Sequence, residues 1–121
     1  EKPRREILEE YLLALALRSK KPAEVKVKVT TPAIKRIFAR IRQAKRFSIT
    51  SFFKALPEEL KEIFSRLYLG ELEKVSIKEE IERTVKELKK LELREKLKEL
   101  AKKGDLEKFS LLSQKLKELE V

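Results

Sequence analysis

The sequence IKEEIERTVKELKKLELREKLKELAKK, residues 77–103, decides the fold. At about 100° per residue, its apolar side chains between residues 77 and 91 lie within about −40° to +80° of the first one. The apolar side chains of residues 93–101 lie instead between about 140° and 240°. The apolar face therefore crosses to the opposite side of one long helix. This predicts that the two halves of the helix pack against two different units.

Both ends of this helix carry signals. Ser76 and Glu79 have the S-x-x-E spacing of a capping box, and Gly104 is typical of a helix end. Asp105 is a suitable cap for a following helix. That last helix has one apolar stripe, made by Leu106, Phe109, Leu112, Leu116 and Leu119. We expect the stripe to pack antiparallel against Leu93, Leu97 and Leu100, as a helical hairpin.

The residues before the long helix predict a bundle. The segment YLLALAL, residues 11–17, is apolar on nearly every side and should be a central, buried helix within residues 4–18. Residues 23–31 alternate valine and lysine, which indicates an extended connector or a short edge strand. Shorter helices follow, and the first of them begins at Thr31 and Pro32. The predicted fold class is all-α: a compact helical bundle, residues 1–91, followed by a projecting carboxy-terminal hairpin, residues 92–121, that shares the long helix.

The composition argues against catalysis in this chain. It has no cysteine and no histidine, so it lacks thiolate ligands, disulfides and the commonest general base. Neighbouring acids such as Glu9–Glu10, Glu58–Glu59 and Glu79–Glu80 point about 100° apart on a helix and cannot share a metal. We expect each pair to lie on a solvated helix face. No catalytic, cofactor or metal site is predicted, and no small-molecule substrate.

Neither a membrane span nor a signal peptide is evident, because the longest apolar run is far shorter than the roughly 20 residues that cross a bilayer. We therefore expect a cytoplasmic protein without a membrane partner. The chain begins at Glu1 without a methionine, and we expect it to be a piece of a longer protein.

The positive charge is concentrated in one segment. The whole chain has a formal net charge of +10, and residues 18–46, with eleven bases and the single acid Glu24, account for all of it. Such a surface suits nucleic acid phosphates, an acidic protein surface, or solvent alone. The candidate contact residues are Arg36, Arg40, Lys45 and Arg46. The phenylalanines have the spacing of core residues, with Phe47 the only candidate for stacking on a base.

Four stretches in this order resemble the carboxy-terminal, helicase-binding domain of bacterial DnaG-type DNA primases. They are EILEEYLLALALRSKKP, TPAIKRIF, LPEELKEIFSRLYL and EEIERTVKELKKLELREKLKEL, and together with the last helix they cover nearly the whole chain. The resemblance implies a helical bundle followed by a hairpin that contacts the amino-terminal domains of the hexameric replicative helicase. It also implies a non-catalytic part of a primase that recruits primer synthesis to the replication fork. The alternatives are a basic helical module that binds nucleic acid and a plain helical scaffold.

On the last helix, Leu111 lies at about 140° from Leu106, away from the apolar stripe. Lys108 and Lys115 flank it, each about one helical turn away. An apolar side chain between two bases suits a groove with an acidic rim on a partner. Lys108, Leu111 and Lys115 are therefore the predicted partner-binding residues.

Overall fold

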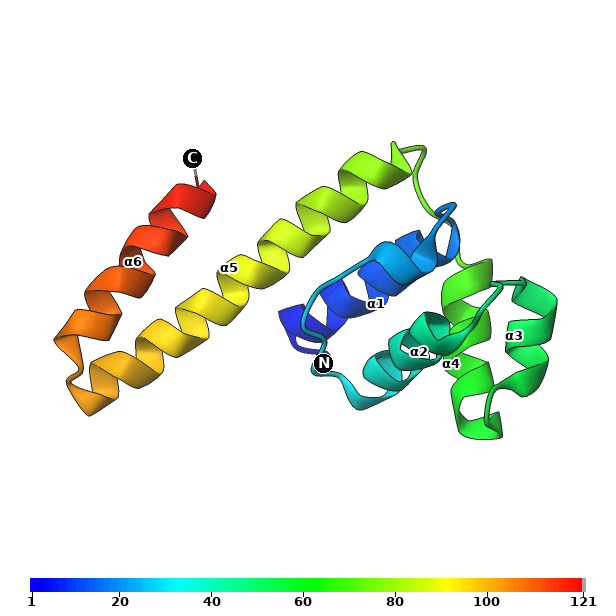
Figure 1. Cartoon of the computed structure of the whole chain (residues 1–121), viewed down its shortest axis with the longest axis horizontal. Coiled ribbons are helices and arrows are strands. Elements are labelled where there is room, and N and C mark those ends of the chain that lie inside the picture. The colour runs from blue at the N-terminus through cyan, green and yellow to red at the C-terminus, as the bar shows by residue number, and fades with distance from the viewer. Residues whose placement is uncertain (121) are drawn as a thin grey trace.

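The computed structural model describes residues 1–120, and within that range the chain is all-α (Figure 1). The predicted all-α class is therefore confirmed, as a bundle joined to a hairpin. The predicted hairpin subdomain ends at Val121, which lies outside the described residues. The elements are α1 (Arg4–Leu17), η1 (a short 3-10 helix, Pro22–Glu24), α2 (Pro32–Gln43), α3 (Ile49–Ala55), α4 (Glu58–Leu69), α5 (Ile77–Lys103) and α6 (Leu106–Glu120).

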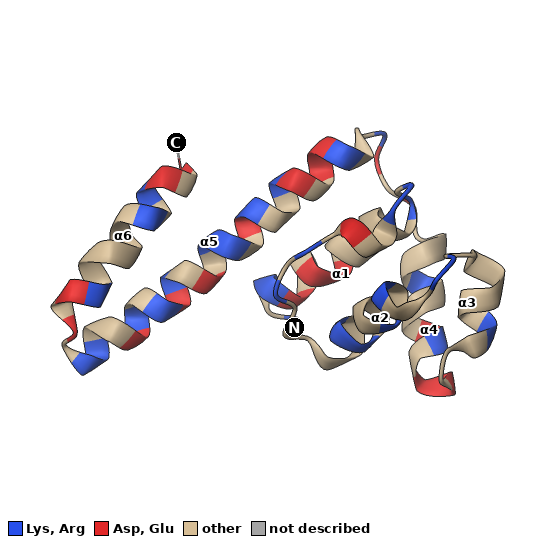
Figure 2. Ribbon diagram, viewed as in Figure 1, with Lys and Arg blue, Asp and Glu red and all other residues tan. Residues whose placement is uncertain are grey.

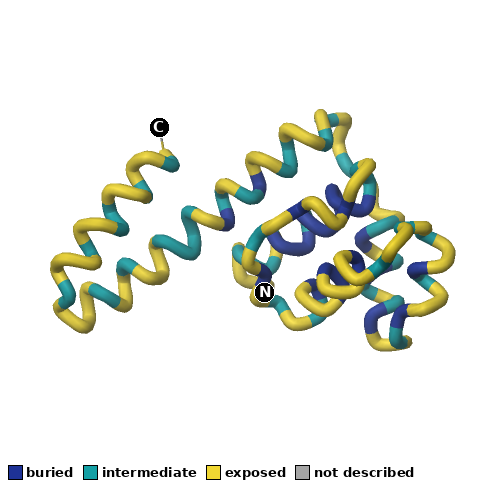
Figure 3. The backbone as a smooth tube through the Cα atoms, in the orientation of Figure 1, coloured by how far each residue is buried: buried dark blue, intermediate teal, exposed yellow. Residues whose placement is uncertain are grey.

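Helix α1 is the centre of the bundle. It packs against α2, α4 and α5, and every residue from Leu12 to Leu17 is buried. Figure 3 shows this concentration of buried backbone in α1 and its contrast with the exposed turns of α6. A helix that is apolar all round needs neighbours on all sides. The prediction of a central helix from the segment at residues 11–17 is confirmed.

Residues 25–31 form an extended connector with no strand partner, so the first of the two predicted alternatives is correct. Val25 and Val29 are buried in the core, whereas Lys26 and Lys28 are exposed. The alternation therefore reflects one buried side of a connector. A strand needs a ladder of backbone hydrogen bonds to a neighbour, and no such neighbour is present within residues 1–120.

The expectation of a solvated face for Glu9 and Glu10 was wrong. Glu9 is 0 % exposed, and its carboxylate accepts hydrogen bonds from the backbone N–H groups of Thr30 (2.9 Å) and Thr31 (2.8 Å). Glu10 is 6 % exposed and accepts from Lys2 (2.8 Å) and Arg66 (2.9 Å). A buried carboxylate is stable when charged donors and backbone N–H groups surround it. These two acids therefore connect α1 to the start of α2 and to α4.

The aromatic residues gather where α3 and α4 meet. Phe52 and Phe64 are buried with ring centroids 5.5 Å apart, and Phe47 lies 5.1 Å from Phe52. Phe64 also stacks on Tyr68 at 6.1 Å. These offset and tilted arrangements are favourable for aromatic pairs. The phenylalanines are core residues, as predicted.

Helix α5 is continuous through the predicted boundary at residue 92 (Figure 1). Thr84 and Leu88 are buried on the side that faces the bundle, whereas the leucines beyond Leu91 are half-buried. The change of face that the sequence predicted lets α5 pack on α1 along one part and on α6 along the other. Ser76 precedes the first helical residue as predicted, but its side chain makes no capping hydrogen bond.

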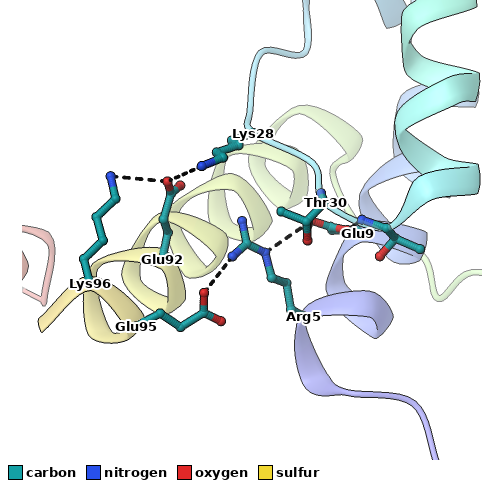
Figure 4. A network of polar contacts seen from close by, with 8 residues as sticks. Arg5, Glu9, Lys28, Thr30, Glu92, Glu95 and Lys96 are labelled. Carbon is teal, nitrogen blue, oxygen red and sulfur yellow. Dashed lines mark hydrogen bonds and ion pairs between the residues drawn. The ribbon is translucent and has the colours of Figure 1, made fainter. Parts of the chain in front are cut away.

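Two ion pairs extend the contact between the bundle and α5 beyond residue 91 (Figure 4). Arg5 Nη1 lies 3.0 Å from a carboxylate oxygen of Glu95, and Lys28 Nζ lies 3.4 Å from one of Glu92. Arg5 also donates from Nε to Glu9 at 3.4 Å. Residues 92–120 are thus not independent of the bundle, because their first turn is fixed to it by side-chain charges.

Helix α6 packs back on α5, on the side away from α1–α4 (Figure 1). Gly104 has a φ of 73°, the left-handed conformation that glycine adopts without strain, and Asp105 Oδ1 accepts from the Lys108 backbone N–H at 3.2 Å. The predicted roles of Gly104 and Asp105 are therefore confirmed. Leu106 is 79 % exposed, so its assignment to the packed stripe was wrong. It occupies the first position of α6, whereas the other four stripe residues are half-buried.

Glu9→Gln should lower the free energy of unfolding by about 2 kcal/mol, because it removes a buried charged acceptor and turns an amide donor toward a backbone N–H. Urea denaturation followed by circular dichroism measures this. Glu58→Gln is the control, since Glu58 is exposed and, within the described chain, pairs only with Lys61. It should cost less than about 0.5 kcal/mol. Equal effects of the two changes would contradict the anchoring role of Glu9.

The same carboxylate makes stability depend on pH. Burial raises the pKa of Glu9, but hydrogen bonds from Thr31, Thr30 and Arg5 outweigh it, and the pKa lies below its ordinary value of 4.5. A pKa that is lower in the folded state contributes stability above the unfolded pKa, and this contribution is lost as the pH falls below 4.5 through the folded value. Melting temperatures between pH 7 and pH 3 should therefore fall less steeply for Glu9→Gln than for the parent chain.

Candidate partner-binding surfaces

Within residues 1–120, no three or more acidic side chains gather closely enough to hold a metal ion. None of the described helices has the length and apolar character needed to cross a membrane. Three surfaces are distinguished by exposure and charge. They are the outer face of α6, the exposed bases of α2 and the turn after it, and a groove beside the amino-terminal half of α5.

The three predicted residues of α6 share one exposed face. Leu111 is 64 % exposed, and Lys108 and Lys115 are exposed on either side of it. The Asp105 cap fixes where α6 begins and therefore the direction in which Leu111 points. Lys108 Nζ lies 3.8 Å from the Asp105 carboxylate, whereas Lys115 lines a crevice between α5 and α6. The arrangement offers one apolar contact with a cation on each side.

The bases predicted to contact nucleic acid or an acidic partner are all exposed. Arg36 pairs across to α4, with Nη2 3.0 Å from Glu59. The backbone N–H of Glu59 donates a hydrogen bond to the carboxylate of the same residue, and this has the largest effect in lowering the pKa of Glu59. The hydrogen bond from the Arg36 guanidinium lowers this pKa further. Arg40, Lys45 and Arg46 make no ion pair with another side chain of the described chain. Three of the four predicted bases are therefore free to meet an external anion.

Other bases of the segment at residues 18–46 have internal roles. Arg18 donates to backbone carbonyls of Ala14 (2.8 Å) and Tyr68 (2.7 Å) and so joins the ends of α1 and α4. Arg42 donates to the Val25 carbonyl at 3.3 Å. A count of charges along the sequence therefore overstates the basic surface, because part of this charge stabilises the bundle. Figure 2 shows that the remaining bases are spread over α2 and the connector before it.

Phe47 does not provide a stacking platform beside these bases. It is half-buried, and its ring packs against Phe52 in the aromatic cluster. Base stacking requires a free aromatic face. The exposed bases of α2 therefore form a purely electrostatic surface.

A groove of about 1000 Å³, which sequence reasoning missed, lies between the amino-terminal half of α5, the loop after α1 and the end of α6. We call it the α5 groove. Its floor is aliphatic and its rim is rich in lysine. The floor residues are Val25, Ile77, Ile81, Val85 and Leu119. The rim lysines are Lys20, Lys21, Lys26, Lys78, Lys86 and Lys89.

Within residues 1–120, the α5 groove lies along the part of α5 that α6 does not cover. Helix α5 has 27 residues and the described helix α6 has 15, so a stretch of about 18 Å at the start of α5 is not covered by α6 within these residues. The difference in length was visible in the sequence. The position of the loop after α1, which forms the opposite wall, was not visible there.

Comparison of the chain with protein-family models, with curated proteins and with solved structures finds no match.

Replacing Arg36, Arg40, Lys45 and Arg46 by Glu should reduce retention on immobilised DNA at low salt while the melting temperature changes little, because all four side chains are exposed. The control changes Lys54, Lys74, Lys98 and Lys103 to Glu, which alters the net charge equally at other exposed positions. A melting temperature that collapses alongside unchanged retention would show that the four bases are structural.

Proposed function

We propose that this chain is the non-catalytic, carboxy-terminal domain of a bacterial DNA primase and that it binds the replicative helicase. Two things support the proposal: the resemblance of four ordered stretches to that family, and an all-α bundle that continues into a hairpin. The observation that carries it is Leu111, which is 64 % exposed between two lysines on the helix farthest from the bundle core. The proposed partner surface is an amino-terminal domain of the helicase hexamer.

The proposed mechanism is recruitment. A bound domain holds the attached primase near the template, so that its effective concentration at freshly unwound single strands reaches the millimolar range typical of short tethers, on the order of 1 mM. No chemistry is required of the docking domain itself. Its contribution is the affinity and the lifetime of the contact.

The face around Leu111 suits such a contact. A leucine on a regular helix loses little freedom when it enters a groove, and residues near the centre of an interface, surrounded by contacts that exclude water, contribute most to binding. Lys108 and Lys115 would then face acids at the edge of the helicase groove and favour its approach. The hairpin also keeps this face clear of the bundle, because α6 packs on the far side of α5 (Figure 1).

A nucleic-acid-binding module is the second candidate, favoured by the exposed and unpaired Arg40, Lys45 and Arg46 among the described residues. Binding dominated by phosphate contacts weakens steeply as salt rises, whereas a contact centred on a leucine weakens less. Binding measured over a range of salt concentrations separates the two functions.

Leu111→Asp should abolish capture of the purified helicase hexamer, at a cost of about 2 kcal/mol or more, because a charge would enter the apolar centre of the contact. Capture on immobilised helicase measures the loss. Circular dichroism should show unchanged helicity and melting temperature, since Leu111 is exposed.

Leu106→Asp is the matched control, because Leu106 is a leucine of α6 that is at least as exposed as Leu111 and points in another direction. Its capture by helicase should equal that of the parent chain. Capture that survives Leu111→Asp with the hairpin intact would place the contact elsewhere.

A further inference from the structure

We propose that the α5 groove binds an acidic amphipathic helix of a partner protein, whose apolar face packs on the groove floor while its acids meet the rim lysines. This site is separate from Leu111 and does not depend on the identity of the helicase. The proposal follows from the shape of the groove, the chemistry of its floor and the charge of its rim.

The shape favours a helix. Ile77, Ile81 and Val85 stand four residues apart on α5 and form a stripe about 12 Å long. Each is only partly buried, although Ile81 and Val85 pack against the core. Leu119, in the last described turn of α6, lines the same groove. A docked helix would continue along α5 the kind of packing that α6 already makes with it.

The floor favours an apolar ligand face. All five floor residues are aliphatic, and no aromatic side chain of residues 1–120 lines the groove. Amphipathic helices bind grooves of this kind through apolar residues at positions i, i+4 and i+7. Single-stranded nucleic acid is disfavoured, because its bases bind by stacking on aromatic faces.

The rim sets the charge of the partner. Seven bases and two acids, Glu24 and Glu82, line the groove. One base is used internally, since Arg18 binds backbone carbonyls, and Lys21 pairs with Glu24 at 3.5 Å. The other five make no ion pair with any side chain in residues 1–120. These five are Lys20, Lys26, Lys78, Lys86 and Lys89. An excess of unpaired cations on opposite walls attracts a helix with acids on both flanks of its apolar stripe.

The lysines come from two walls of different origin. Lys20 and Lys26 belong to the loop between α1 and α2, whereas Lys78, Lys86 and Lys89 belong to α5. A helix lying between these walls would have its two acidic flanks neutralised independently. This distribution distinguishes the α5 groove from a single charged helix face, which neutralises only one side of a ligand.

The test uses a fluorescein-labelled, stapled peptide of 15 residues with leucines at i, i+4, i+7 and i+11 and glutamates on both flanks, measured by fluorescence anisotropy at physiological salt. Saturable binding is expected. Lys86→Glu with Lys89→Glu should weaken it at least tenfold, since both side chains are exposed and their replacement leaves the fold intact. The control pair, Lys98→Glu with Lys102→Glu, changes the same charge on the same helix outside the groove and should leave binding unchanged.

Two further probes complete the test. A peptide of the same composition with its leucines scattered around the helix should bind at least tenfold more weakly, and single-stranded DNA should not displace the ordered peptide. Leu111→Asp should leave peptide binding unchanged, so that the groove and the helicase contact are tested separately. Equal binding of the scattered peptide, displacement by DNA, or an equal effect of the control pair would overturn the proposal.

Discussion

The buried carboxylate of Glu9 is the interaction on which the bundle depends. It sits on the central helix and receives the backbone N–H groups of Thr30 and Thr31 at 2.9 and 2.8 Å, just before α2 begins. A negative charge at this position is also favourable for the start of a helix. The connector makes no ladder with another strand, so this carboxylate sets where the connector ends and α2 starts. Figure 4 shows that Arg5 joins the same carboxylate to Glu95 of α5.

Elements defined by local patterns could be predicted from the sequence. The apolar run at residues 11–17 predicted a buried helix because no amphipathic arrangement accommodates it. Gly104 and Asp105 predicted the tight turn of the hairpin, since the left-handed conformation and the side-chain cap are properties of single residues. The apolar stripe on α5 crosses from one side of the helix to the other. This predicted two packing partners, because the angle of each side chain depends only on its position in the helix. The exposure of Leu111 followed from its angle on the helix alone.

Features that depend on distant segments could not be predicted in this way. Glu9 looks like any solvated glutamate until α1 is placed beside Thr30 and Thr31, which are more than twenty residues away in the chain. Arg18 and Arg36 contribute to a basic segment in the sequence, but they bind carbonyls and Glu59 once the helices pack. The α5 groove has three walls from separate elements, so no local pattern contains it. Ion pairs, hydrogen bonds between distant residues and grooves arise from tertiary packing, and the periodicity of apolar residues along one helix carries no information on them.

Because α5 is one continuous helix, a tilt of the hairpin also tilts the part of α5 that packs on the bundle. Beyond Glu95 the helix runs to Lys103, a distance of about 12 Å, so a tilt of about 10° moves its far end by about 2 Å. A straight helix transmits such a tilt because its own hydrogen bonds resist bending. The nearest resistance on the bundle side is Arg5, whose guanidinium holds Glu95 and Glu9 together. A displacement of Glu95 would therefore act first on the guanidinium that also contacts Glu9, the carboxylate that accepts the backbone N–H groups just before α2.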